Sequence, residues 1–156
     1  MENFNLIWAK FSETAIIPSK RESDAGFDLY VDCKGDINLH SIGIQPNSTV
    51  RFDTNIGVVI PKGYVGIVKE RSSTGKLSMF VGAGIIDEGY RGQIGVFITN
   101  TSNEHIYLPV SKAVAQMIVV KCEHSNSENI FYGTPEEFAN KYPSERGLGK
   151  EGSSGK

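Results

Sequence analysis

The segment from Gly82 to Gly95 is the feature that most restricts how this chain can fold. Five of its fourteen residues are glycine, and the apolar runs on either side, Leu77 to Val81 and Val96 to Ile98, have the character of β-strands. Glycine at this density lets main chain approach main chain, or a ligand, with no Cβ in between, at an entropic cost to the folded state. The segment therefore predicts a β-hairpin whose tip and inner face are bare main chain.

One carboxylate, Asp87, stands at the centre of this segment, next to Glu88 and three residues before Tyr90. A pocket lined by main-chain N–H and C=O groups suits a flat polar ring with a fixed pattern of donors and acceptors, such as a nucleobase. A tight hairpin with ordinary acidic turn residues has the same composition. On these fourteen residues alone both interpretations stay open.

Short β-rich runs separated by turn residues make up most of the remaining chain. They recur at spacings of roughly 8–12 residues, which is typical of a sandwich, barrel or jelly roll. No helical periodicity interrupts residues 37–70. We therefore expect an all-β fold, a jelly roll or distorted barrel, with strands near residues 4–8, 27–31, 50–52, 56–60, 64–68, 77–81, 94–99, 105–108 and 113–120.

One short helix is expected near the C-terminus. Thr134 can cap it, Pro135 suits its first position and Glu137 completes a capping box. After Pro143 the chain is rich in glycine and serine, which predicts a flexible tail. The expected organisation is a β domain over residues 1–143 and a phosphate-binding arm over residues 144–156.

Charge and cysteine content narrow the class of protein. A net charge of −2 and a pI near 5.9 argue against holding DNA or RNA through the overall field, although a local cluster can still bind a small anion. Cys33 and Cys122 form no disulfide framework or metal-ligand spacing, so free thiols in a reducing compartment are expected. No apolar run approaches the roughly 18 residues of a membrane span, and Met1 to Asn5 lacks a basic signal region. We expect a cytoplasmic protein without a membrane partner.

Three further places carry polar side chains that suit a binding cleft. Asp28 follows Gly26 at the head of a strand and alternates with apolar neighbours, although a solvent-facing position fits equally. Arg71, with Ser72 and Ser73, directly follows a strand and makes a plausible anion-binding turn. Gln116 interrupts the apolar run of residues 113–120, which reads as a strand buried on both faces; its amide either is satisfied in the core or reaches the cleft.

These segments together resemble the five motifs of the trimeric dUTPases. The resemblance rests, in family order, on Ala25 to Leu29, Arg71 to Ser73, Gly84 to Gly92, Ala115 to Ile118, and Arg146 to Gly149 with Gly152 to Gly155. It implies a jelly roll that forms a homotrimer with active sites shared between subunits. It also implies hydrolysis of dUTP to dUMP and pyrophosphate with Mg²⁺, which keeps uracil out of DNA and supplies dUMP for dTMP synthesis.

The resemblance also implies a role for each matching residue. Asp87 would be the general base that activates the attacking water, and Tyr90 would pack under the deoxyribose. Main-chain groups of Ala83, Gly84, Ile85 and Gly95 would read the uracil edge, and Asp28 and Gln116 would hold water ligands of the magnesium. Ser72 and Ser73 would donate to the phosphates, and Arg71 would either supply positive charge to them or brace the site. Arg146, Gly152 and Ser153 would bind the phosphates from a neighbouring subunit.

Two positions depart from the family pattern. Ser111-Lys112-Ala113 replaces the usual start of the fourth motif, so its arginine is missing. Glu151 stands where a phenylalanine usually stacks on the uracil, which should weaken closure of the tail, since stacking is worth about 1–3 kcal/mol.

Two other functions compete with dUTP hydrolysis. The related dCTP deaminases need a glutamate base where this chain has Phe97, which argues against deamination. The other is a regulatory protein on the same scaffold, in which nucleotide occupancy controls a protein partner.

Overall fold

The computed structural model describes residues 6–36, 38–123 and 130–144. The chain divides into two units, Met1–Glu123 and His124–Lys156, and the first contains every strand in the described ranges. The strands are β1 (Ile7–Lys10), β2 (Phe27–Leu29), β3 (Ser41–Ile44), β4 (Ser48–Asp53), β5 (Ile56–Val59), β6 (Tyr64–Lys69), β7 (Met79–Gly82), β8 (Ile85–Ile86), β9 (Gly95–Asn100), β10 (Ile106–Pro109) and β11 (Ala115–Lys121). The helices are α1 (Ser72–Gly75) and α2 (Pro135–Lys141).

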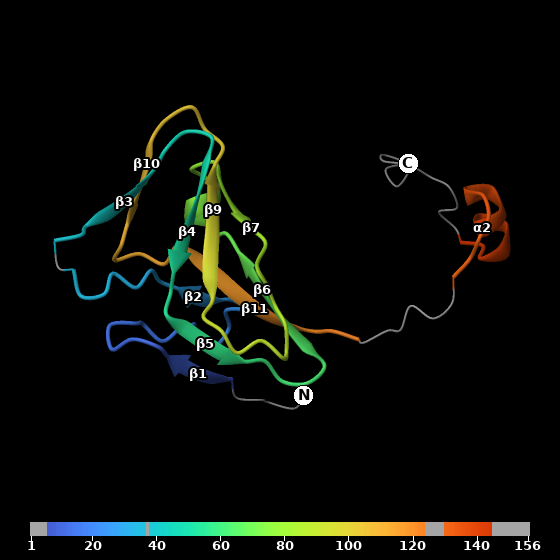
Figure 1. Ribbon diagram of the computed structural model, residues 1–156, viewed down its shortest axis with the longest axis horizontal. Coiled ribbons are helices and arrows are strands. Elements are labelled where there is room, and N and C mark those ends of the chain that lie inside the picture. Colours follow the sequence, from blue (N-terminus) through green and yellow to red (C-terminus); the bar gives the residue numbers. More distant parts are fainter. Residues whose placement is uncertain (1–5, 37, 124–129, 145–156) are drawn as a thin grey trace. The chain divides into compact units, whose positions relative to one another are not determined.

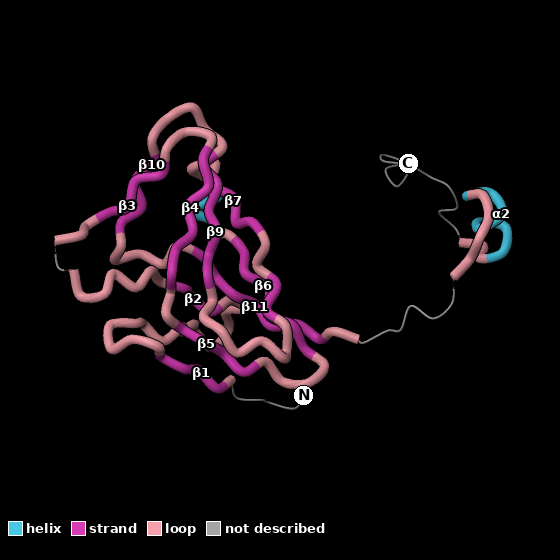
Figure 2. The backbone as a smooth tube through the Cα atoms, viewed as in Figure 1, coloured by secondary structure: helices cyan, strands magenta, loops and turns pink. Residues whose placement is uncertain are grey.

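The strands form four small antiparallel sheets rather than one continuous sheet. Their orders are β2-β11-β6-β8, β4-β9-β7, β1-β5 and β10-β3. Most sheet neighbours are distant in sequence, so long crossing connections tie the sheets into one unit (Figure 1). Strands and loops account for nearly all of it (Figure 2). This arrangement agrees with the predicted all-β class.

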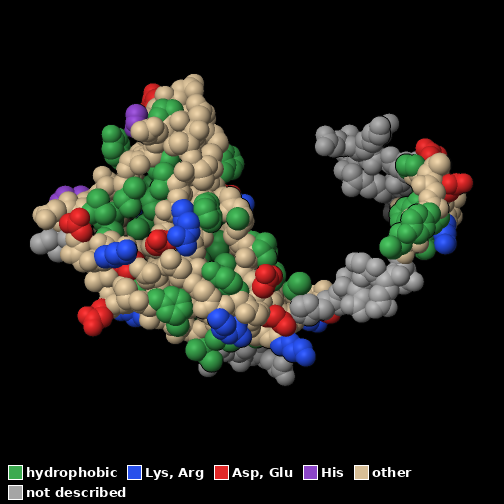
Figure 3. All heavy atoms as spheres, in the orientation of Figure 1, with side chains coloured by type: hydrophobic (Ala, Val, Ile, Leu, Met, Phe, Trp, Pro, Cys, Tyr) green, Lys and Arg blue, Asp and Glu red, His purple; other side chains and the backbone are tan. Residues whose placement is uncertain are grey.

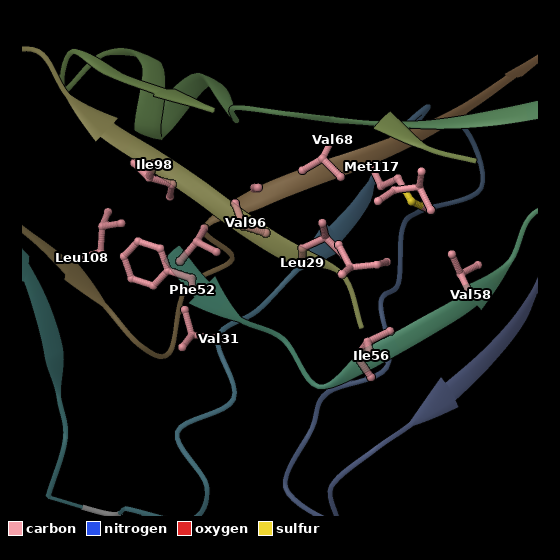
Figure 4. Packing of buried hydrophobic residues seen from close by; sticks show 14 of the residues in the cluster. Leu29, Val31, Phe52, Ile56, Val58, Val68, Val96, Ile98, Leu108 and Met117 are labelled. Atoms are coloured by element: carbon pink, nitrogen blue, oxygen red, sulfur yellow. The ribbon is translucent and has the colours of Figure 1, made fainter. Parts of the chain in front are cut away.

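Alternating burial along the strands builds the core. In β9, Val96 and Ile98 are fully buried while Phe97 between them is exposed, as the two-residue period of a strand requires. Their side chains face those of Val68 and Met117, which come from the sheet of β6 and β11 (Figure 4). The core therefore lies between these two sheets. The outward faces of the sheets are not needed for the core and can carry binding sites.

The predicted hairpin forms and then divides between two sheets. β7 pairs antiparallel with β9, with Gly82 opposite Phe97. Directly afterwards Ala83 and Gly84 both adopt left-handed backbone, with φ of 56° and 93°. This double turn carries the chain away from β9, so that β8 pairs with β6 instead. The hairpin therefore opens at its tip and leaves main chain uncovered there.

Several sequence expectations needed correction. The turn after β6 contains the one-turn helix α1, and neither β3 nor β8 was among the expected strands. β11 is not buried on both faces: Ala115 and Met117 are buried, but Ile118 and Val119 are half-buried and Val120 is exposed. An apolar run of this length looks the same whether its second face is covered by the same chain or not.

A buried carboxylate, that of Asp32, connects the N-terminal segment to the rest of the β unit through hydrogen bonds. Asp32 is 6% exposed and accepts hydrogen bonds from Ser12 Oγ (2.5 Å), Thr14 Oγ1 (2.6 Å), Asn55 Nδ2 (2.7 Å) and the main-chain N–H of Lys34 (2.9 Å). Burial by itself would raise the pKa of Asp32, but these four donors outweigh it and lower the pKa well below its ordinary value. Asp32 is therefore a structural anion.

The second unit contains the predicted helix. Thr134 Oγ1 accepts from the N–H of Glu137 at 3.2 Å, and Glu137 Oε2 accepts from the N–H of Thr134 at 2.8 Å, so the capping box is confirmed. The rings of Phe131, Phe138 and Tyr142 cluster along this helix. Neither helix in the described ranges has the length and apolar character that a bilayer crossing needs.

Candidate active site

The first of two hollows in the β unit gathers residues from three of the predicted motifs. It has a volume of about 1000 Å³ and is lined by the loop of residues 19–26, by Asp28 of β2, by Arg71, Ser72 and Ser73, and by Gln116 and Ile118 of β11. Asp28 and Gln116 lie opposite each other where β2 pairs with β11. Both side chains therefore face the cleft and not the core.

A forked ion pair joins two strand ends in this hollow. Arg71 Nε lies 2.9 Å from Asp28 Oδ1, and Arg71 Nη2 donates to Asp28 Oδ2 at 3.2 Å. Both side chains are about one-third exposed, at 32% and 28%, so water screens the pair and its net energy is modest. The fork matters for geometry, because Asp28 holds the guanidinium in a fixed plane.

Gln116 braces the turn that carries Arg71. Its Nε2 donates to the main-chain oxygen of Glu70 at 3.0 Å, at the end of β6. A Cβ on Gly26 would lie 2.5 Å from Gln116 Oε1, so Gly26 leaves the room that this amide occupies. The pKa of the Glu70 carboxyl is lowered, chiefly because the carboxylate accepts a hydrogen bond from the main chain of Glu70 itself. The nearby side chain of Lys69 lowers it further.

The short helix α1 displays the two serines. Thr74 is buried, and its Oγ1 both accepts from the N–H of Arg71 and donates to the oxygen of Arg71, each at 2.9 Å. This exchange closes the turn and leaves Ser72 and Ser73 exposed in the wall of the hollow. The predicted turn therefore forms, and neither serine hydroxyl has a hydrogen-bond partner among the described residues; anion binding there stays a prediction.

The second hollow lies at the divided hairpin. It has a volume of about 290 Å³ and is lined by the predicted residues Ala83, Gly84, Ile85, Asp87, Tyr90 and Gly95, together with Arg51, Ile86, Gln93 and Phe97. Pockets for small molecules start at about this size. Left-handed backbone at Ala83 and Gly84 forms the turn that lines this space.

Asp87 and Tyr90 stand at its rim. Asp87 is exposed, and its carboxylate makes no hydrogen bond or ion pair with any residue in the described ranges. The Tyr90 hydroxyl donates to the oxygen of Gln93 at 2.9 Å, and a Cβ on Gly92 would lie 2.5 Å from that hydroxyl. Gly92 therefore lets the ring of Tyr90 fold back across the hairpin tip.

Sequence reasoning missed several lining residues. Lys20 and Arg21 line the first hollow, where a hydrogen bond between Arg21 and Asp24 lowers the pKa of Asp24 and raises that of Arg21. Arg51 and Phe97 line the second. Lys20 and Arg21 are basic and lie close in sequence to Gly26, so they could have been predicted to line the first hollow. Arg51 could not have been predicted for the second, because only strand register brings it next to Phe97.

The two hollows have no lining residue in common. Within the described residues of one chain, the predicted site residues therefore fall into two groups, with Asp28, Arg71, Ser72, Ser73 and Gln116 in one and the hairpin residues in the other. Arg146, Glu151, Gly152 and Ser153 lie outside the described residues.

Comparison with known proteins identifies the family. The dUTPase family model matches residues 12–153, which is most of the chain. The chain belongs to the dUTPase family.

Similar dUTPases come from several sources. The human mitochondrial deoxyuridine 5'-triphosphate nucleotidohydrolase is 35% identical over 153 residues, which are 97% of this chain but 55% of the human protein. This chain therefore spans about half the length of that relative. The solved native EIAV dUTPase is 33% identical, with a TM-score of 0.66 over 82% of this chain and 97% of that one. A Staphylococcus bacteriophage 80alpha dUTPase solved with dUpNHpp has a TM-score of 0.78 at 21% identity, over 99% and 100% of the two chains, and shows the shared fold.

The polar side chains of the first hollow suit a hydrated magnesium ion. No group of three or more His, Cys, Asp or Glu side chains that could hold a metal ion directly occurs among the described residues. Magnesium, however, keeps several waters and is often bound through one or two carboxylates together with substrate phosphates. The carboxylate of Asp28 has lone pairs beyond its two bonds to Arg71, and Gln116 Oε1 is a second acceptor beside it. These residues fit water-mediated binding of the ion.

Proposed function

We propose that this chain hydrolyses dUTP to dUMP and pyrophosphate. The observation that carries the proposal is the hairpin hollow of a chain of the dUTPase family. This hollow combines uncovered main chain with the carboxylate of Asp87, which has no hydrogen bond or ion pair to the part of the chain that the structure describes. Main-chain N–H and C=O groups of Ala83, Gly84, Ile85 and Gly95 would recognise the edge of the uracil ring. Tyr90 would pack against the deoxyribose and fill the space of a 2′-hydroxyl.

Asp87 acts as the general base in this proposal. Its carboxylate accepts a proton from water, the water oxygen forms a bond to the α-phosphorus, and the bond from that phosphorus to the bridging oxygen breaks. The electron pair leaves with pyrophosphate, and dUMP remains. Positioning and charge neutralisation supply most of the acceleration in phosphoryl transfer.

The first hollow would hold the triphosphate. Ser72 and Ser73 donate to phosphate oxygens, and Arg71, fixed by Asp28, supplies positive charge at a set place. When bound, Mg²⁺ would neutralise phosphate charge there, with Asp28 and Gln116 hydrogen-bonding to its water ligands. Arg146, Gly152 and Ser153 would close over the nucleotide.

A homotrimer with shared sites explains why one chain carries two separate hollows. A nucleotide has its base and its phosphates in one molecule, so the hairpin hollow of one subunit would meet the phosphate hollow of another. Several large apolar side chains are exposed in the single chain, among them Ile7, Phe80, Ile85 and Tyr107, at 54–65% exposure. Green hydrophobic patches also lie among the charged groups in Figure 3. Contact surfaces of this kind suit assembly.

The two competing functions have less support. The hairpin hollow has Phe97 where a deaminase would need its glutamate. A bacteriophage 80alpha dUTPase is described as controlling transfer of virulence genes, but at 21% identity the likeness extends to the fold alone. A regulatory protein partner for this chain stays a prediction.

Pyrophosphate release from dUTP, dTTP, dCTP and UTP, with Mg²⁺ present, tests the proposal. The wild-type chain should prefer dUTP, and Asp87→Asn should lower kcat by roughly 10²–10⁴-fold while dUMP binding persists. Glu88→Gln is the matched control: it changes the adjacent carboxylate, which accepts from the N–H of Gly63 at 2.7 Å, and should stay near wild-type activity. Near-normal turnover by Asp87→Asn would refute the assignment of the base.

A further inference from the structure

An aromatic ring lies uncovered in the hairpin hollow. Phe97 is 39% exposed although both of its neighbours in β9 are fully buried, so its ring points away from the core. The position opposite it on β7 is Gly82, and two residues before it on the same face is Gly95. With no side chain at Gly82, the ring has an open flank on that side toward the hollow that it lines.

A guanidinium group holds the other side of this ring. Arg51 lies opposite Phe97 on β4, and its Cζ is 5.9 Å from the ring centroid. Arg51 forms an ion pair with Asp53, whose Oδ1 also accepts from Gln93 Nε2 at 3.2 Å. The guanidinium therefore has a fixed place within cation–π distance of the ring.

Arg51 also lies directly over the main chain that borders the hollow. A Cβ on Gly95 would fall 2.7 Å from Arg51 Nε, so the absence of a side chain at Gly95 lets the guanidinium cross it. Arg51 has five N–H donors and no acceptor, and the pair with Asp53 leaves donors free. A ligand in the hollow therefore meets an aromatic face and a hydrogen-bond donor side by side.

We propose that Phe97 and Arg51 form a wall of the base pocket and hold the pyrimidine ring of the nucleotide. The proposal rests on the proposed dUTP hydrolysis and names the side chains that contact the base. The ring of Phe97 supplies apolar contact and stacking, and Arg51 donates to a carbonyl oxygen of the base while it braces the ring. The wall belongs to the hairpin half of the site, so it acts on the base and not on the phosphates.

Inhibition of dUTP hydrolysis by two partial ligands separates these roles. Deoxyuridine has the base and no phosphate, whereas pyrophosphate has phosphate and no base. Phe97→Leu removes the ring and keeps an apolar side chain; it should raise the Ki of deoxyuridine about tenfold, the lower range of base stacking, and leave the Ki of pyrophosphate unchanged. Arg51→Met should raise the deoxyuridine Ki by a smaller factor. Phe97→Tyr keeps a ring and should remain close to wild type.

Phe11→Leu is the matched control. Phe11 is an exposed phenylalanine directly after β1, is 51% exposed and does not line the hollow, so both inhibition constants should stay at wild-type values. Equal deoxyuridine inhibition of wild type and Phe97→Leu would overturn the wall. So would an equal rise of both constants, since that would indicate general damage to the site. A wild-type chain that does not hydrolyse dUTP would count against the proposed function instead. In that case calorimetric titration with deoxyuridine tests the wall. Equal deoxyuridine affinity of wild type and Phe97→Leu would then overturn the wall.

Discussion

Replacing Gly84 with alanine tests the double turn that opens the hairpin. Gly84 has a φ of 93°, and its oxygen accepts from the N–H of Val68 at 2.7 Å. A Cβ at this position would lie 2.7 Å from the main-chain oxygen of Val68, an atom that cannot move without disturbing β6. The substitution therefore meets both a left-handed backbone and a steric clash.

The two costs can be estimated separately. Left-handed backbone costs a residue with a Cβ about 1–2 kcal/mol. Forcing an extra methyl group into packed surroundings costs about 1–3 kcal/mol more. Gly84→Ala should therefore lower the free energy of unfolding by roughly 2–5 kcal/mol. It should also raise the KM for dUTP, because the displaced main chain borders the hairpin hollow that we propose binds the base.

Two other glycines supply matched controls. Gly63 has a φ of 78° with nothing within 4 Å of an added Cβ, so Gly63→Ala should cost only the backbone term, about 1–2 kcal/mol. Gly89 also has open space and is not in the left-handed region, so Gly89→Ala should be close to neutral. Urea unfolding of all three at one protomer concentration gives the comparison, because the stability of an oligomer depends on concentration. If Gly84→Ala were no less stable than Gly63→Ala, the clash with Val68 would not exist in solution.

Three further changes test other parts of the molecule. Asp32→Asn should lower the free energy of unfolding by about 2–3 kcal/mol at pH 7. Because the pKa of Asp32 is lowered far below its unfolded value of about 3.9 on folding, this stabilisation is fully present above about pH 4 and is lost progressively as the pH falls from there toward the folded-state pKa. The difference from wild type should therefore be constant above about pH 5 and shrink steadily below about pH 4; a difference that stays constant in acid would contradict the reasoning. Tyr90→Ala should narrow the kcat/KM preference for dUTP over UTP, and unchanged discrimination would place sugar selection elsewhere. Glu151→Phe should lower the KM for dUTP more than it changes kcat, through added stacking, whereas an unchanged or higher KM would show that the tail closes by another route.

Local patterns in the sequence were sufficient for the described strands other than β3 and β8, and for helix α2. Alternating burial marks β4 and β9, and the capping box of Thr134 and Glu137 forms as predicted. The density of glycine between residues 82 and 95 predicted the hairpin, because glycine has no side chain to cover the main chain. These features depend on neighbours within a few residues, which any single sequence displays.

Contacts between distant segments were decided only by the tertiary structure. Arg71 and Asp28 are 43 residues apart, and nothing local shows that they form a fork. The departure of the chain at Ala83, a non-glycine residue in left-handed backbone, opened the hairpin toward β6. The register between β4 and β9 placed Arg51 beside Phe97 in the hairpin hollow. Strand register is set by packing across the whole core, so the same residues could have paired differently without any change in their local pattern.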